Sequence, residues 1–207
     1  MSALISATAL SHSFPGNGPL FVGLDFSFRP GELIALVGPS GSGKSTLLSI
    51  LAGWTPPASG TLERIGVTHT GWVFQNPHGS PRRTALDHVV LPLLARGYSR
   101  DAAEDEATLL LERFSLGSVG GRVFRDLSGG EAQRLMLARA VATQSDLLLI
   151  DEPTAQLDLR AASTVNEVIA SIAGDDTIVV VATHDRRTRD SCTRVIDLTD
   201  YQQAGGR

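Results

Sequence analysis

The sequence is poor in several features, and each shortage excludes a class of protein. One cysteine, Cys192, occurs in 207 residues, so no disulfide can form within the chain, as is usual in a reducing compartment. The formal charge of −4 lacks the basic excess of a nucleic-acid-binding surface. No apolar run approaches the roughly 20 residues that cross a bilayer, since the best candidate, Val89 to Ala95, is short and contains Pro92. We therefore expect no nucleic-acid partner and no transmembrane segment, so that any membrane role requires another protein.

The most informative motif that is present covers residues 38–46. It reads Gly-Pro-Ser-Gly-Ser-Gly-Lys-Ser-Thr and matches the phosphate-loop pattern G-x-x-x-x-G-K-[ST]. An apolar run over 33–37 precedes it and a helix-compatible run over 47–52 follows, which is the strand–loop–helix context that the motif requires. Backbone N–H groups of such a loop surround an anion, and the helix N-terminus adds partial positive charge. We expect Lys44 to reach the β- and γ-phosphates of a nucleotide and Ser45 to place its hydroxyl on Mg²⁺. The expected nucleotide-binding residues of this loop are Gly38, Pro39, Ser40, Gly41, Ser42, Gly43, Lys44, Ser45 and Thr46.

A second motif is a pair of acids, Asp151 and Glu152, after the apolar run 147–150. Successive side chains of a strand point to opposite sides, so the two carboxylates need different roles. We expect Asp151 to hold the Mg²⁺ shell and Glu152 to poise a water for attack on the γ-phosphate. A solvated acid pair at a strand end is the alternative, and it would be favoured if no phosphate loop came earlier in the chain.

A third motif covers residues 127–134, Leu-Ser-Gly-Gly-Glu-Ala-Gln-Arg. Ser128 with Glu131 three residues later is a capping-box pattern at a helix start. Gly129 and Gly130 would expose backbone N–H groups there and form a second anion site. An ordinary capped helix explains the spacing equally well, so spacing alone leaves both interpretations open.

Together and in this order, the motifs resemble those of the ATP-binding cassette (ABC) ATPases over nearly the whole chain. Residues 127–133 resemble the family's signature, and Gln75 resembles the glutamine of the loop that leads into a helical sub-domain. Residues 155–158, Ala-Gln-Leu-Asp, resemble the loop that crosses the dimer interface, and His184 resembles the switch histidine that contacts the γ-phosphate. Phe14 lies where an aromatic residue stacks on adenine, although the family more often has tyrosine there.

The resemblance implies a full set of site residues and cofactors, with ATP and Mg²⁺ as the ligands. The residues expected to act in catalysis are Glu152, His184 and Gln75. Those expected at the magnesium ion are Ser45, Gln75 and Asp151. Outside the phosphate loop, those expected to contact nucleotide are Phe14, Ser128, Gly129, Gly130 and Asp158.

The resemblance also implies partners. Two cassettes of this family face each other head to tail, so a single copy of each motif implies a homodimer with two composite sites. This fits the expectation that the N–H groups of Ser128, Gly129 and Gly130 need an anion which their own chain does not supply. A separate integral membrane permease is the second implied partner, and the elements around residues 82–94 are expected to contact it at the cytoplasmic face of the cell membrane.

Residues 84–93 and 180–187 resemble the cassettes of lipoprotein-releasing and macrolide-exporting systems. This implies an ATPase that powers export or release of an amphipathic or hydrophobic cargo, such as a lipoprotein, peptide, antibiotic or haem. The alternative is an ATPase that pulls on a membrane partner for signalling and moves no substrate. The motifs do not separate the two, because both use the same ATPase.

The expected fold class is α/β: a P-loop NTPase core with a mainly parallel sheet, a small antiparallel β sub-domain and an inserted helical sub-domain. We expect a single domain over residues 1–207, with the helical insertion at about 76–126. The segment 59–74 is shorter than is usual in the family, so the antiparallel sub-domain is expected to be trimmed. The expected strands are 4–12, 20–28, 33–37, 147–151, 177–182 and 194–198, with short strands within 59–74. The expected helices are 84–95, 99–114, 129–143 and 161–173, the last closed by Gly174, with a flexible break at 117–121 and a loose tail from 202.

Overall fold

A five-stranded parallel sheet lies at the centre of the computed structural model, which describes residues 3–16, 18–172 and 176–202. Its strand order is β5-β6-β7-β3-β8. The strands are β3 (Leu33–Val37), β5 (Thr70–Val73), β6 (Leu147–Asp151), β7 (Ile178–Ala182) and β8 (Arg194–Asp197). Strands β6 and β7 are almost wholly apolar because their alternate side chains enter two different cores, one on each face of the sheet.

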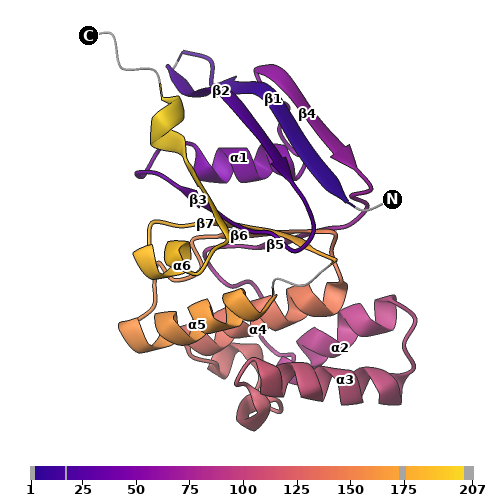
Figure 1. Ribbon diagram of the computed structural model, residues 1–207. Coiled ribbons are helices and arrows are strands. Elements are labelled where there is room, and N and C mark those ends of the chain that lie inside the picture. The colour runs from indigo at the N-terminus through magenta and orange to yellow at the C-terminus, as the bar shows by residue number, and fades with distance from the viewer. Residues whose placement is uncertain (1–2, 17, 173–175, 203–207) are drawn as a thin grey trace.

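A three-stranded antiparallel sheet, ordered β2-β1-β4, covers one side of the parallel sheet. It consists of β1 (Leu4–Ser13), β2 (Pro19–Phe28) and β4 (Ser59–Ile65). Helix α1 (Lys44–Leu51) lies between the two sheets (Figure 1). The core around it includes Phe21, Phe28, Leu36, Leu48 and Leu149.

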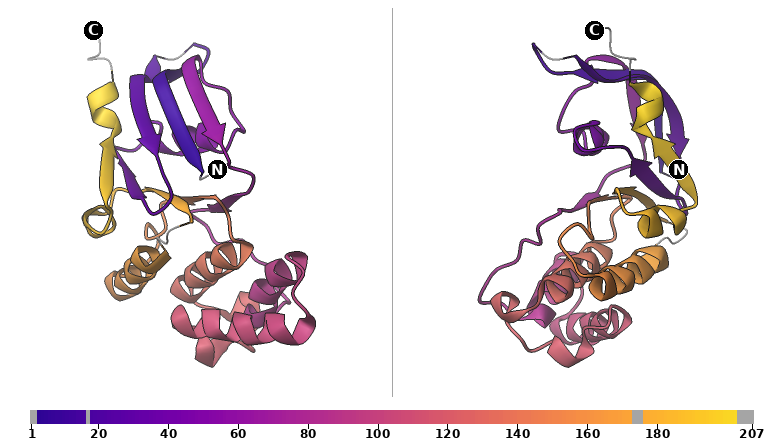
Figure 2. Two further views of the ribbon diagram at one scale, coloured as in Figure 1. Left: turned by 45° about the vertical axis from the view of Figure 1, so that its right-hand side comes forward. Right: turned by 90° about the vertical axis from the view of Figure 1, so that its left-hand side faces the viewer.

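The remaining longer helices cover the opposite side, so that the antiparallel sheet and the helical layer lie at the two ends of the molecule (Figure 2). These helices are α2 (Ala85–Ala95), α3 (Arg100–Arg113), α4 (Gly129–Thr143) and α5 (Leu159–Ile172). The shorter ones are η1 (Gly117–Val119), η2 (Phe124–Asp126), α6 (Arg186–Asp190) and η3 (Leu198–Tyr201). The core on this side includes Val89, Leu111, Leu137, Ile150 and Ile169. None of the helices in the described part of the chain is both long and apolar enough to cross a membrane.

Local sequence signals explain where several helices begin. The hydroxyls of Thr84, Ser99 and Ser128 accept N–H groups of the first turns of α2, α3 and α4, which satisfies donors that the helix itself leaves free. Helix α4 follows Ser128 and ends at Thr143, as predicted. Helix α5 begins at Leu159, two residues earlier than predicted, and its predicted end at Gly174 lies outside the described residues.

The fold class predicted from the sequence is confirmed. The short strands predicted within 59–74 are β4, which pairs with β1, and β5, which pairs with β6 in the parallel sheet. The segment 117–121 is not a flexible break but a hydrogen-bonded turn, in which the N–H of Val119 donates to the carbonyl of Leu116 at 3.0 Å. Of the predicted loose tail, residues 203–207 lie outside the described part of the chain.

Candidate nucleotide-binding and catalytic site

The loop over residues 38–43 joins β3 to α1 and closes tightly because of its glycines. Gly43 is the N-cap of α1 and has a φ of 96°, in the left-handed region that favours glycine. A Cβ on Gly43 would lie 3.1 Å from the Cβ of Leu20 and 3.2 Å from the ring of Phe21. The loop can therefore pack against the start of β2 only with glycine at this position.

Lys44 is the first residue of α1, and its ammonium is held by three acceptors. Its Nζ donates to the carbonyls of Gly38 at 3.0 Å and Pro39 at 3.3 Å. It also forms an ion pair with Oε1 of Glu152 at 3.3 Å. Both side chains are largely buried, with 8% of Lys44 and 13% of Glu152 exposed. The cation of the phosphate loop is thus paired with the carboxylate at the end of β6.

Glu152 also contacts the end of the neighbouring strand β7. Its second oxygen, Oε2, lies 2.7 Å from Nδ1 of His184 and accepts the His184 backbone N–H at 3.3 Å. Glu152 has a φ of 45°, which is uncommon for a residue other than glycine, and its N–H donates to the carbonyl of Ala182 at 2.9 Å. The ends of two parallel strands therefore bring Glu152 and His184 to the phosphate loop, where ligands of open α/β sheets bind.

Asp151 is the last residue of β6, and its environment fits a bound cation. Its Oδ1 is buried and has no hydrogen-bond partner among the described residues. Burial raises the pKa of this carboxyl above its usual value, and Glu152 raises it further, while the hydroxyl of Ser45 and the charge of Lys44 lower it. Magnesium is held in phosphate sites by one or two carboxylates, hydroxyls and phosphate oxygens. The pair Asp151 and Ser45 supplies that donor set, although the described residues include no cluster of three metal-ligating side chains.

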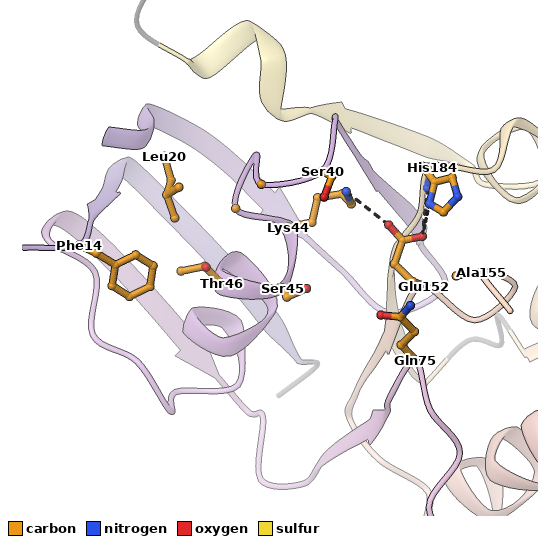
Figure 3. A pocket seen from close by; sticks show the side chains of 12 residues that line it. Phe14, Leu20, Ser40, Lys44, Ser45, Thr46, Gln75, Glu152, Ala155 and His184 are labelled. Atoms are coloured by element: carbon orange, nitrogen blue, oxygen red, sulfur yellow. Dashed lines mark hydrogen bonds and ion pairs between the residues drawn. The ribbon is translucent and has the colours of Figure 1, made fainter. Parts of the chain in front are cut away.

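The site residues surround a cavity of about 700 Å³, a volume typical of ligand pockets. Phe14 lies at one end, Glu152 and His184 lie at the other, and the phosphate loop runs between them (Figure 3). The predicted site residues that line it are Phe14, Ser40, Gly41, Gly43, Lys44, Ser45, Thr46, Gln75, Glu152 and His184. Its shape therefore suits an elongated ligand with a flat group at one end and an anion at the other.

Two residues that line this cavity, Leu20 and Ala155, were not among the predicted site residues. Leu20 follows the turn after Phe14 and packs near Gly43; it carries no polar group, so its proximity in the chain to Phe14 was the only available signal. Ala155 begins the segment 155–158, whose resemblance to the loop at the family's dimer interface was the signal for it.

The predicted residues Ser128, Gly129, Gly130 and Asp158 do not line the cavity. The expectation that the Ser128 N–H lacks an acceptor in its own chain is wrong, because it donates to Oε2 of Glu131 at 2.7 Å. Gly130 is buried, and a Cβ there would lie 3.0 Å from the Cβ of Ala161 on α5. Asp158 caps α5, since its Oδ1 accepts the N–H of Ala161 at 2.9 Å. Within one chain these residues therefore serve helix capping and packing.

Comparison with known proteins agrees with this geometry. Residues 21–155 match the sequence profile of the ABC transporter family. The chain belongs to the ABC transporter family.

Three curated members of the ABC transporter family indicate the range of relatives. An uncharacterized ABC transporter ATP-binding protein of Mycobacterium tuberculosis (strain H37Rv) is 42% identical over 87% of this chain and 59% of its own length. The lipoprotein-releasing system ATP-binding protein LolD of Xylella fastidiosa is 38% identical over 86% of this chain and 81% of its own. The macrolide export ATP-binding/permease protein MacB of Rhodopseudomonas palustris (strain BisB18) is 36% identical over 86% of this chain and 29% of its own. The chain thus spans less than two thirds of the first and third of these relatives.

Solved structures of ABC cassettes superpose on the whole fold. A dimeric cassette in a post-hydrolysis state, bound to ADP and Pi, has a TM-score of 0.81 and 26% identity, covering 97% of both chains. A dimeric bacterial ABC transporter cassette has a TM-score of 0.78 and 26% identity, covering 93% of both. The described chain therefore has the fold of the ABC transporter cassettes.

Proposed function

We propose that this cassette binds ATP in the 700 Å³ cavity and hydrolyses it to power export or release of an amphipathic cargo through a separate membrane permease. One observation carries the proposal. Lys44, Glu152 and His184 come from three separate elements and meet at one end of the cavity, beside the phosphate loop. A cation for phosphate oxygens, a carboxylate for water and a histidine bound to that carboxylate are the groups that phosphoryl transfer to water needs.

In the proposed reaction, the oxygen of a water attacks the γ-phosphorus, and the bond from that phosphorus to the β–γ bridging oxygen breaks. Glu152 orients this water and accepts its proton, and His184 holds Glu152 through the 2.7 Å contact. Lys44 exchanges its ion pair with Glu152 for the phosphate oxygens, which frees the carboxylate for the water. Ser45, Asp151 and Gln75 would hold Mg²⁺, which when bound neutralises phosphate charge.

The base end of the site involves Phe14, whose side chain is 45% exposed and lines the cavity away from Lys44. We infer that its ring stacks on adenine, because an exposed aromatic face beside a phosphate cradle gives a base an apolar partner.

We infer further that two copies of the chain form a homodimer. Ser128, Gly129, Gly130 and Asp158 lie outside their own cavity, so a second copy would bring its α4 N-terminus to the phosphates. The dimeric cassettes among the structural relatives support this arrangement. Each copy would be a single cassette, with the helices of residues 76–126 as its inserted sub-domain.

The proposed permease contact lies on the groove beside α2. A cavity of about 580 Å³ there is lined by residues that include Arg83, Leu91 and Arg139. An adjoining cavity shares His78 and Arg139 with it and is also lined by Trp72 and Phe74. The rings of Trp72 and Phe74 stack with centroids 5.3 Å apart, and the exposed Trp54 stacks on Trp72. Apolar and cationic side chains on one face suit a cytoplasmic segment of a membrane protein, so we place the cassette at the cytoplasmic face of the cell membrane. The names of LolD and MacB support lipoprotein release or macrolide export as the type of transport.

Phosphate release by the purified chain with ATP and Mg²⁺, alone and with its permease, tests the proposal. Replacing Lys44 by alanine removes one charged partner of the phosphates, a loss of about 1.5–3 kcal/mol or about ten- to hundredfold in ATP affinity. Arg29→Ala, which removes a positive charge from an exposed turn, is the matched control and should bind ATP normally. Equal ATP affinity of Lys44→Ala and the control by calorimetry would contradict the proposed site.

The cargo requires a separate experiment with the reconstituted complex. ATP-dependent loss of a labelled lipoprotein or macrolide from vesicles would support transport. Hydrolysis that changes the permease conformation without loss of any such cargo would instead identify a complex for mechanical signalling.

A further inference from the structure

His12 is a buried polar residue with no role in the proposed reaction. It lies on β1, and 6% of its side chain is exposed. Neither ring nitrogen has a hydrogen-bond partner among the residues that the structure describes. Burial of an unpartnered polar group costs free energy, so a residue of this kind calls for an explanation other than hydrogen bonding.

The imidazole of His12 touches the proposed base-binding residue. Its centroid lies 4.9 Å from that of the Phe14 ring, and the two planes are at 84°, an edge-to-face pair. On its other side, the centroid of the Phe21 ring lies 6.3 Å away at 30°. His12 and Phe21 are also partners in the β1–β2 register.

Phe21 packs against the phosphate loop at Gly43. It is fully buried, and its ring lies 3.2 Å from where a Cβ on Gly43 would stand. His12 therefore lies between Phe21, which packs against the phosphate loop, and the exposed ring of Phe14. It supports the Phe14 ring from the buried side of the antiparallel sheet.

We propose that His12 is a positioning residue that fixes the Phe14 ring in the orientation needed to stack on the nucleotide base. The inference rests on the proposed function, in which Phe14 stacks on adenine. Edge-to-face is one of the preferred arrangements of aromatic pairs, so the contact with His12 favours one orientation of the Phe14 ring. A side chain that is already ordered loses less freedom when a ligand binds. Because both ring nitrogens are unpartnered, the aromatic face and edge of His12 carry this role, and its hydrogen-bonding capacity does not.

A pair of variants of similar size separates aromatic support from space filling. His12→Leu fills the volume without an aromatic ring, and His12→Phe keeps a ring. We expect His12→Leu to weaken ATP binding about two- to tenfold, the usual worth of one aromatic pair, and His12→Phe to bind like the parent. In steady-state hydrolysis His12→Leu should raise KM with kcat unchanged, since only binding is altered.

A double-mutant cycle with Phe14→Ala tests whether His12 acts through Phe14. We expect Phe14→Ala to weaken ATP binding, and His12→Leu to have no further effect in the Phe14→Ala background. Inorganic tripolyphosphate, which lacks a base, should bind equally to parent, His12→Leu and Phe14→Ala. Melting temperatures identify any variant that fails to fold, in which case His12→Phe and the Phe14→Ala arm still test the proposal.

The possible failures are distinguishable. If no form of the protein binds ATP, the proposed function fails. If Phe14→Ala binds ATP like the parent, the base platform is wrong, and the role of His12 falls with it. If Phe14→Ala weakens binding but His12→Leu does not, only the positioning role is overturned. It is also overturned if His12→Leu weakens tripolyphosphate binding equally, because the effect would then reach the phosphate loop through Phe21.

Discussion

Replacing Glu152 by glutamine separates two tasks of one carboxylate, its pairing with Lys44 and its proposed handling of water. Lys44 Nζ and Glu152 Oε1 are 3.3 Å apart, and both side chains are largely buried. At an effective dielectric constant of about 20, unit charges at this distance attract by about 5 kcal/mol. ATP must replace this interaction when its phosphates bind Lys44, so the ion pair competes with the nucleotide.

The expected change in affinity follows from the type of hydrogen bond. Glutamine keeps an oxygen that can accept from Lys44, but it has no charge. Charged hydrogen bonds contribute about 1.5–3 kcal/mol and neutral ones about 0.5–1.5 kcal/mol. The interaction of residue 152 with Lys44, which competes with ATP, therefore weakens by about 1–1.5 kcal/mol. Glu152→Gln should accordingly bind ATP about five- to tenfold more tightly than the parent. Loss of the proposed base should slow turnover by a factor of about 10² to 10⁴.

Calorimetry with ATP in EDTA measures affinity without hydrolysis, and phosphate release with Mg²⁺ measures turnover. Glu167→Gln is the matched control, because Glu167 is exposed on α5 and does not line the cavity. ATP affinity no higher than that of the parent would show that the Lys44–Glu152 pair does not compete with nucleotide. Turnover at the parent rate would show that Glu152 does not handle the water.

Three further predictions concern hydrolysis, pH dependence and packing. His184→Ala should lower kcat about tenfold or more by removing a partner of Glu152, with an unchanged melting temperature because His184 is 65% exposed. A kcat equal to that of the parent would show that hydrolysis does not need the contact between His184 and Glu152. Burial raises the pKa of the Asp151 carboxyl in the folded state, so with rising pH the unfolded chain loses the proton of this carboxyl before the folded chain does. The free energy of unfolding therefore falls as pH rises from about 4 through the raised pKa. Asp151→Asn should remove this fall and be more stable than the parent at pH 7 in urea without Mg²⁺, and a lower stability would refute the burial penalty. Gly130→Ala places a Cβ 3.0 Å from that of Ala161, at a cost of about 1–3 kcal/mol, of which the helix propensity of alanine offsets about 1 kcal/mol. The free energy of unfolding should therefore fall by up to about 2 kcal/mol; a higher urea midpoint would mean that α4 and α5 move apart to accept the methyl group.

Local chemistry explains why much of this fold could be predicted from sequence. The phosphate loop needs glycines between a strand and a helix, and residues 38–46 satisfy that need within one short segment. The caps at Thr84, Ser99 and Ser128 likewise depend on the next three or four residues. The buried strands β6 and β7 are recognisable because both faces are covered, which makes their sequences continuously apolar.

Contacts between distant segments could not be predicted in the same way. Both β4 and β5 have the pattern of a short strand, but only the three-dimensional structure decides that β4 joins β1 and β5 joins β6. The pairing of Lys44 with Glu152 joins residues that lie far apart in the chain, and neither residue's neighbours signal it. The burial of His12 against Phe21 depends on how β1 and β2 pair, so the sequence offered no sign of it.

The charges of the cavity bear on the proposal that two copies of the chain complete the site. The charged residues that line it are Lys44 and Glu152, and they neutralise each other. Asp151 lies beside them and adds a negative charge when it is ionised. A triphosphate in this cavity would therefore be stabilised by backbone N–H groups of the loop, and further by a cation held by Asp151 and Ser45 and by donors from outside the cavity. The N-terminus of α4 carries a partial positive charge and exposes Ser128 and Gly129 at the surface. In the proposed dimer, that N-terminus supplies the donors that a single cavity lacks, so binding of the nucleotide and association of the two copies stabilise each other.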